Sequence, residues 1–139
     1  MKEETRLLLE KAERALQAAQ TLLDTGDTEF SAGRVYYAML YGAQALLREN
    51  DLQFSKHSGV HAAFGQHFAK TGVIDPKYHR WLLDAFDERL QGDYGFQVRL
   101  TVEAVAARLE QAHEFLGEIK RYLEGGHQPI REDLPEGEE

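Results

Sequence analysis

Cysteine is absent from the 139-residue sequence, which excludes disulfide frameworks, thiolate catalysis and zinc sites built on sulfur. Long apolar runs are absent too: none approaches the roughly 20 residues needed to span a bilayer, so we expect no membrane contact. Its first residues, MKEETRLLLEKAE, mix charges with short apolar clusters and do not form a secretory signal. These absences predict a soluble, cytoplasmic protein.

Positive charge is also scarce. The chain has 16 lysine and arginine residues against 24 acids, giving a formal net charge of −8. Nonspecific binding to duplex DNA needs a positive surface that displaces counterions, so a duplex DNA partner is not expected. No glycine-rich loop follows a strand, which excludes the phosphate-cradling folds.

Apolar residues recur at alternating steps of three and four along the chain, and no segment has the alternation of a strand. This pattern predicts an all-α fold, an up-and-down bundle of about five helices within one domain, residues 1–125. An acidic tail, residues 126–139, is expected to be flexible. The helices are expected near residues 3–24, 28–49, 55 or 58 to 70, 76–91 and 101–123.

The second predicted helix is apolar on nearly all sides, which is typical of a helix surrounded by others. Arg34 lies within it, and a charge on a buried helix is costly unless it is paired. The fifth helix repeats an unbroken apolar stripe from Val102 to Leu123. That stripe predicts packing against another helix, either inside the bundle or across a dimer.

Two polar groups are candidates for a site. Arg34, Tyr37 and Tyr41 are spaced i, i+3, i+7, so they share one side of the second helix. They form either a polar seam that serves folding or the lining of a binding groove, and the residues alone favour folding. In the second group, Arg89 and Asp93 lie near the predicted end of the fourth helix at Gly92, where such residues usually cap or pair.

Histidines offer little support for a metal site. His57 and His61 are spaced i, i+4, which could place two imidazoles on one helical face. A site needs a third ligand, and no HEXXH or comparable motif is present. We therefore expect no metal and no other cofactor.

Three segments, read together, resemble the HEPN-domain family (higher eukaryotes and prokaryotes nucleotide-binding). They occur in the expected order between about residues 12 and 123: SAGRVYYAMLYGAQALL (Ser31 to Leu47), KHSGVHAAFGQHF (Lys56 to Phe68) and ERLQGDY (Glu88 to Tyr94). The resemblance implies a helical bundle that often dimerises. It also implies pairing with a minimal nucleotidyltransferase as toxin and antitoxin.

Many members of this family are metal-independent ribonucleases, in which an arginine is followed after four to six residues by a histidine. The resemblance implies that the arginine holds phosphate and the histidine acts as general acid or base. In this sequence four residues separate Arg89 from Tyr94, so a tyrosine stands where such relatives carry histidine. Tyrosine, with a pKa near 10, is a poor general base at neutral pH, so the sequence leaves catalysis open.

We therefore expect a cytoplasmic HEPN-like homodimer that binds a nucleotide or RNA as the toxin-like or accessory partner of a minimal nucleotidyltransferase. Arg89 is expected to contact phosphate and Tyr94 to stack on a base or donate a hydrogen bond. Asp93 is expected to pair with Arg34. The remaining groove residues are Tyr37 and Tyr41, with His57 a second-tier ligand contact because the HSG segment belongs to the resemblance.

Two alternatives remain open at this point. One is an active metal-independent ribonuclease whose nonstandard site uses Arg89 with Tyr94 or a histidine of a partner subunit. The other is a protein-interaction module without catalysis, in which the polar seam only specifies folding.

Overall fold

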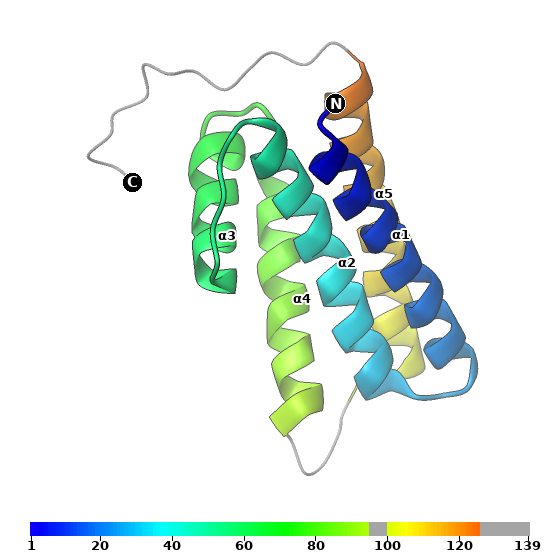
Figure 1. Cartoon of the computed structure of the whole chain (residues 1–139). Coiled ribbons are helices and arrows are strands. Elements are labelled where there is room, and N and C mark those ends of the chain that lie inside the picture. The colour runs from blue at the N-terminus through cyan, green and yellow to red at the C-terminus, as the bar shows by residue number, and fades with distance from the viewer. Residues whose placement is uncertain (95–99, 126–139) are drawn as a thin grey trace.

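A computed structural model describes residues 1–94 and 100–125 of the chain (Figure 1). Its α-helices are α1 (Glu3–Asp24), α2 (Thr28–Glu49), α3 (His57–Phe64), α4 (Pro76–Tyr94) and α5 (Val102–Glu124), and a π-helical segment, η1 (Gly65–Ala69), continues α3. The long helices α1, α2, α4 and α5 alternate in direction (Figure 1). No strand occurs within the described residues, and the all-α bundle prediction is confirmed.

Polar side chains fix the starts of three helices where the sequence predicts them. Asp27 and Thr101 each accept a hydrogen bond from a backbone N–H three residues along the chain, at 3.5 and 3.0 Å. Asp75 accepts from the second backbone N–H after it at 2.9 Å. These bonds satisfy N–H groups that have no partner inside the helix. None of the described helices has the length and hydropathy of a bilayer span.

Helix α2 is the centre of the bundle, as its apolar composition predicts, because it contacts all four of the other α-helices. Its Gly42 marks a close approach of α5: a Cβ there would lie 2.5 Å from Leu116 and 3.4 Å from Phe115. The apolar stripe of α5 is buried inside the bundle from Val105 to Leu123, and only Val102 is exposed. That stripe therefore does not require a dimer.

The third helix differs from the prediction in its start and its end. It begins at His57 after Lys56, and no side-chain bond from Ser55 or Ser58 caps it. After Phe64 the helix widens into η1, where the Lys70 N–H donates to the carbonyl oxygen five residues earlier at 2.8 Å. A periodicity of three and four in the sequence cannot distinguish this wider turn from an α-helix.

Helix α4 does not end at Gly92, as predicted, but continues to Tyr94. Gly92 instead allows close packing against α2, because a Cβ there would lie 3.0 Å from the carbonyl oxygen of Glu29. The missing side chain lets the last turn of α4 lie against the first turn of α2. This contact positions the residues of the candidate site.

Candidate functional site

Four of the residues predicted to form a site line one hollow between α2 and α4. Arg34 and Tyr37 come from α2, and Arg89 and Asp93 from the last turns of α4. The hollow has a volume of about 450 Å³. We call it the α2–α4 groove, and its remaining lining residues are Leu22, Glu29, Phe30 and Gly33.

Two guanidinium groups lie over the ring of Tyr37. The Cζ atom of Arg34 is 4.8 Å from the ring centre, and that of Arg89 is 5.3 Å from it. Arg89 also lies 5.8 Å from the ring centre of Tyr36. The electron-rich ring faces attract both cations and hold them at the groove without neutralising their charge.

The predicted pairing of Asp93 with Arg34 is wrong. Asp93 pairs instead with Arg89, whose Nε lies 3.0 Å from Oδ2 at the spacing i, i+4. This pair exists because α4 continues past Gly92, which puts both residues on one helical face. Within the described residues Arg34 forms no ion pair, so its charge faces the groove without a carboxylate partner.

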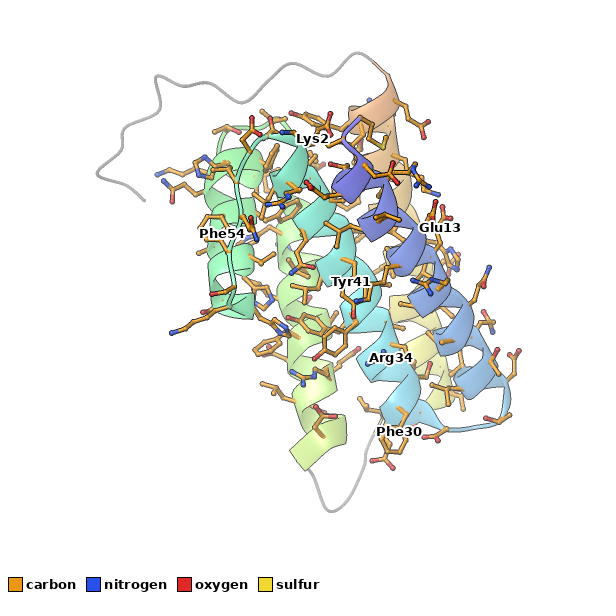
Figure 2. The ribbon with its side chains drawn as sticks, viewed as in Figure 1. Lys2, Glu13, Phe30, Arg34, Tyr41 and Phe54 are labelled. Carbon is orange, nitrogen blue, oxygen red and sulfur yellow. The ribbon has the colours of Figure 1, made fainter. Side chains whose placement is uncertain are left out.

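Tyr41 extends this arrangement along α2, outside the groove itself. Its ring centre is 5.8 Å from that of Tyr37, and the Nζ atom of Lys11 in α1 lies 4.7 Å above it. Figure 2 shows Phe30, Arg34 and Tyr41 following one another along α2. The structure thus brings Tyr41 close to the predicted site residues, although it does not line the hollow.

His57 joins the site through a buried tyrosine. The hydroxyl of Tyr36 lies 2.7 Å from Nε2 of His61 and 3.3 Å from Nδ1 of His57. The hydroxyl carries one proton, so it donates to one imidazole and accepts from the other. The His57 ring is also 5.6 Å from the Tyr37 ring, which puts it beside the arginine-bearing wall of the groove.

The environment keeps both imidazoles neutral at pH 7. Burial, and then the Arg89 guanidinium, lower the pKa of His57. Burial lowers the pKa of His61 to about 4, with smaller contributions from His57 and His79. Burial also raises the pKa of the Tyr36 hydroxyl. His57, which is partly exposed, is therefore a neutral imidazole close to an arginine.

Sequence reasoning did not select Tyr36, His61 or Phe30 for the site. The sequence does point to Tyr36 and His61, because they lie in the RVYY and HSGVH segments that carry the family resemblance. The indication for Phe30 is weaker: it precedes Arg34 by one helical turn on the same face of α2. Tyr94 is the last residue of α4, and its side chain lies outside the described part of the structure.

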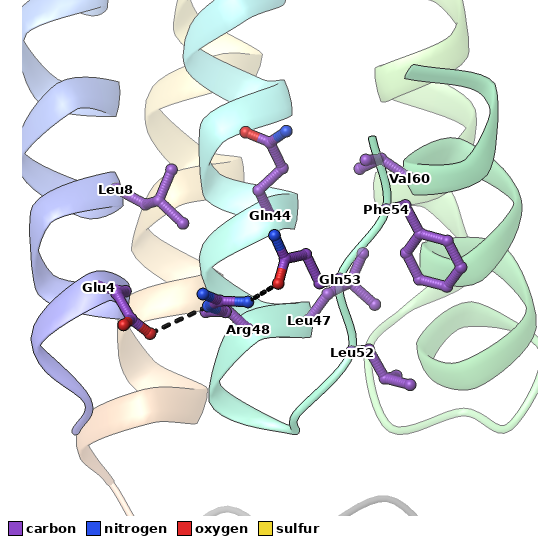
Figure 3. Close-up of a pocket in the computed structure, with 9 residues that line it drawn as sticks. All are labelled: Glu4, Leu8, Gln44, Leu47, Arg48, Leu52, Gln53, Phe54 and Val60. Atoms are coloured by element: carbon purple, nitrogen blue, oxygen red, sulfur yellow. Dashed lines mark hydrogen bonds and ion pairs between the residues drawn. The ribbon is translucent and has the colours of Figure 1, made fainter. Parts of the chain in front are cut away.

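Two other hollows in the described part of the chain hold none of the predicted site residues. One of about 240 Å³ lies between α1, α2 and the segment before α3 (Figure 3). Its single cation, Arg48, lies 3.0 Å from a Glu4 oxygen and also donates to Gln53. Another hollow, of about 560 Å³, lies between α1 and α5, where Lys120 pairs with Glu13. In both, the cations are already paired with polar side chains.

Comparison with known proteins decides the family. The sequence model of the HEPN domain matches residues 5–127, which is most of the chain. The chain belongs to the HEPN domain family. The resemblance seen in its three motifs is confirmed.

Curated relatives match this HEPN chain over most of their lengths. A protein of Methanocaldococcus jannaschii named "Putative toxin MJ0142" is 34% identical over 122 residues, covering 88% of this chain and 83% of its own. A UPF0332 protein of Thermotoga maritima is 37% identical over 114 residues, covering 82% and 86%. A second M. jannaschii protein, "Putative toxin MJ0605", is 32% identical over 123 residues, covering 88% and 91%.

Proposed function

We propose that this HEPN protein is the toxin-like partner of a minimal nucleotidyltransferase and binds a nucleotide or RNA in the α2–α4 groove. The names of the two M. jannaschii relatives support the toxin-like part of the proposal. The observation that carries the binding part is the pair of guanidinium groups over Tyr37, from Arg34 and Arg89. The nucleotidyltransferase partner is proposed from the family resemblance.

The groove suits a phosphate because arginine binds its oxygens with two parallel N–H donors. Arg34 is available for this role, since it forms no ion pair within the described residues. Arg89 is held by Asp93 through its Nε, which leaves the outer nitrogens of the fork for a ligand. Asp93 then has a positioning role: it orients the guanidinium that contacts the phosphate.

Replacing Arg89 by alanine is expected to weaken binding of a nine-nucleotide oligouridylate about 10- to 150-fold. This range corresponds to the roughly 1.5–3 kcal/mol of a hydrogen bond to a charged group. Fluorescence anisotropy with a labelled oligonucleotide measures the affinity. Arg89→Lys, which keeps the charge and loses the fork, is expected to recover only part of it.

Arg80→Ala is the matched control, because Arg80 is an exposed arginine on the same helix and its loss changes the net charge equally. It should leave the affinity within about twofold of the wild type, as expected for an isolated surface charge. Equal affinities for the Arg89→Ala and Arg80→Ala proteins would contradict a phosphate site at the groove.

Ribonuclease activity is a second candidate, and the neutral His57 is the observation that favours it. A neutral imidazole can accept a proton from an attacking hydroxyl, while a nearby arginine stabilises the developing charge. His57 and Arg89 lie against the same two rings, Tyr36 and Tyr37. RNA cleavage that persists in EDTA and disappears in Arg89→Ala would support this candidate, and an inert purified protein would exclude it.

The homodimer implied by the resemblance is also part of the proposal. Its interface need not include the apolar stripe of α5, because that stripe is buried within a single chain from Val105 to Leu123. Sedimentation of the purified protein measures the state directly. A monomer at micromolar concentration would remove this part without affecting the groove.

A further inference from the structure

One face of α2 carries three aromatic side chains and an arginine. Phe30, Arg34, Tyr37 and Tyr41 are spaced i, i+4, i+7, i+11, so they form one stripe on the helix. Figure 2 shows its labelled members, Phe30, Arg34 and Tyr41, in line along α2. At 1.5 Å per residue the stripe is about 16 Å long, which is much longer than a single nucleotide.

We propose that this stripe, the α2 track, binds a single-stranded stretch of RNA across several nucleotides, with its bases against the aromatic rings. The inference rests on the proposed function and deepens it, because it chooses extended RNA over a free nucleotide as the ligand. Proteins that bind single strands combine cations that follow the backbone with aromatic rings that stack on bases. Nucleotides stacked on one another are about 3.4 Å apart, so the track covers at most about five of them.

Phe30 is the clearest stacking position on the track. Its side chain is 61% exposed, although it lies in the first turn of a helix that is otherwise central to the bundle. Within the described residues no other aromatic ring or cation packs on it, unlike Tyr37 and Tyr41. It also lines the α2–α4 groove, so a base on Phe30 lies next to a phosphate held by Arg34 or Arg89.

The other members of the track are a cation, a supporting ring and a second stacking ring. Arg34, itself on the track, lies over Tyr37, and Lys11 of α1 lies over Tyr41 at 4.7 Å, so each tyrosine holds a cation over its ring. Tyr37 is surrounded by rings and guanidinium groups and acts as a support. Tyr41, partly exposed and covered by Lys11 on one side, is the second stacking position.

A protein partner is the competing occupant of such a face, and the distribution of charge favours RNA. The cores of protein interfaces are depleted of charged residues, whereas Arg34, Arg89 and Lys11 all lie along or beside this stripe. Two carboxylates, Glu29 and Asp93, also line the groove, and Asp93 pairs with Arg89, so these five side chains together carry one net positive charge in a chain of net charge −8. With three phosphate contacts, log affinity should fall with log salt at a slope of about −2, at roughly 0.7 per contact.

The test compares uridine 5′-monophosphate with oligouridylates of three, five and nine nucleotides. Affinity is expected to rise with length to about five nucleotides and then level off. Phe30→Ala should weaken binding of the nine-mer roughly 5- to 150-fold, the range for losing one base-stacking ring. Tyr41→Leu, which retains apolar packing, should act similarly.

Two control variants test whether a loss of affinity comes from the aromatic ring at position 30. Phe30→Tyr preserves the ring and should retain the affinity for the nine-mer. Phe54→Ala removes another exposed phenylalanine, one that lies by the hollow in Figure 3 instead of the track, and should change nothing. Circular dichroism of each variant verifies the helical fold.

Distinct outcomes overturn the track and the proposed function separately. Binding that is independent of length and unaffected by Phe30→Ala, but lost in Arg89→Ala, would overturn the track and leave the phosphate site. Conversion of a dimer to a monomer by Phe30→Ala, with unchanged affinity for the nine-mer, would show that the stripe is a protein interface. Failure of every uridylate to bind would overturn both.

Discussion

Replacing Phe115 by alanine is expected to lower the free energy of unfolding by about 3–5 kcal/mol. The Phe115 ring is completely buried and lies 5.5 Å from that of Phe64 and 6.0 Å from that of Tyr78. It also packs at the place where Gly42 brings α2 and α5 together. One truncation therefore removes contacts among α2, α3, α4 and α5 and leaves a cavity at the centre of the bundle.

Urea denaturation followed by circular dichroism, at equal protein concentrations, measures this loss. Phe30→Ala is the matched control, since it removes the same side chain from an exposed position on α2 and should change stability by no more than about 0.5 kcal/mol. A cost below 1 kcal/mol for Phe115→Ala would contradict the central position of this ring. The same Phe30 variant separates stability from RNA binding.

Acidification is expected to destabilise the protein through His61, by about 2–3 kcal/mol between pH 7 and pH 4.5. His61 is 8% exposed, and burial lowers its pKa to about 4 from an unfolded value near 6.5. Between these values the unfolded chain binds a proton that the folded chain does not. The free energy of unfolding therefore falls as pH falls through this window, at up to 1.36 kcal/mol per pH unit, and levels off below about pH 4.

A variant isolates this effect from other titrating groups. The lowered pKa values of Glu49 and Glu114 also make the folded state weaker in acid, below about pH 4.5. His61→Gln keeps an acceptor for the Tyr36 hydroxyl and does not titrate. Wild type should lose about 2–3 kcal/mol more than this variant on going from pH 7 to 4.5. Equal losses in the two proteins would contradict a neutral, buried His61.

The positions of the helices could be predicted from sequence because local signals determine them. Apolar periodicity and the capping residues Asp27, Asp75 and Thr101 act within a few positions of each helix start. The two errors arose from contacts distant in sequence. Gly92 has the sequence character of a helix stop, but it continues α4 because it lies against α2. The π-helical segment η1 begins at Gly65, where a Cβ would lie 2.7 Å from the His79 ring.

The sequence predicted which residues form the candidate site, but it did not predict which of them form ion pairs and hydrogen bonds with one another. The motifs identified Arg34, Tyr37 and Arg89, which the structure brings together in one groove. The partner of Asp93 depended on whether α4 continued past Gly92, which no local pattern revealed. The Tyr36–His61 bond joins residues 25 positions apart, and only the packing of α3 against α2 makes it visible.

The central claim is that Arg34 and Arg89 hold the phosphates of a single-stranded RNA at the α2–α4 groove. Arginine side-chain Nε–Hε resonances of the labelled protein, followed during titration with the nine-nucleotide oligouridylate, test it most directly. We expect the Arg34 and Arg89 resonances to shift in proportion to saturation while those of Arg80 and Arg48 stay fixed. Shifts confined to Arg48, or unchanged Arg34 and Arg89 resonances at saturation, would contradict the claim.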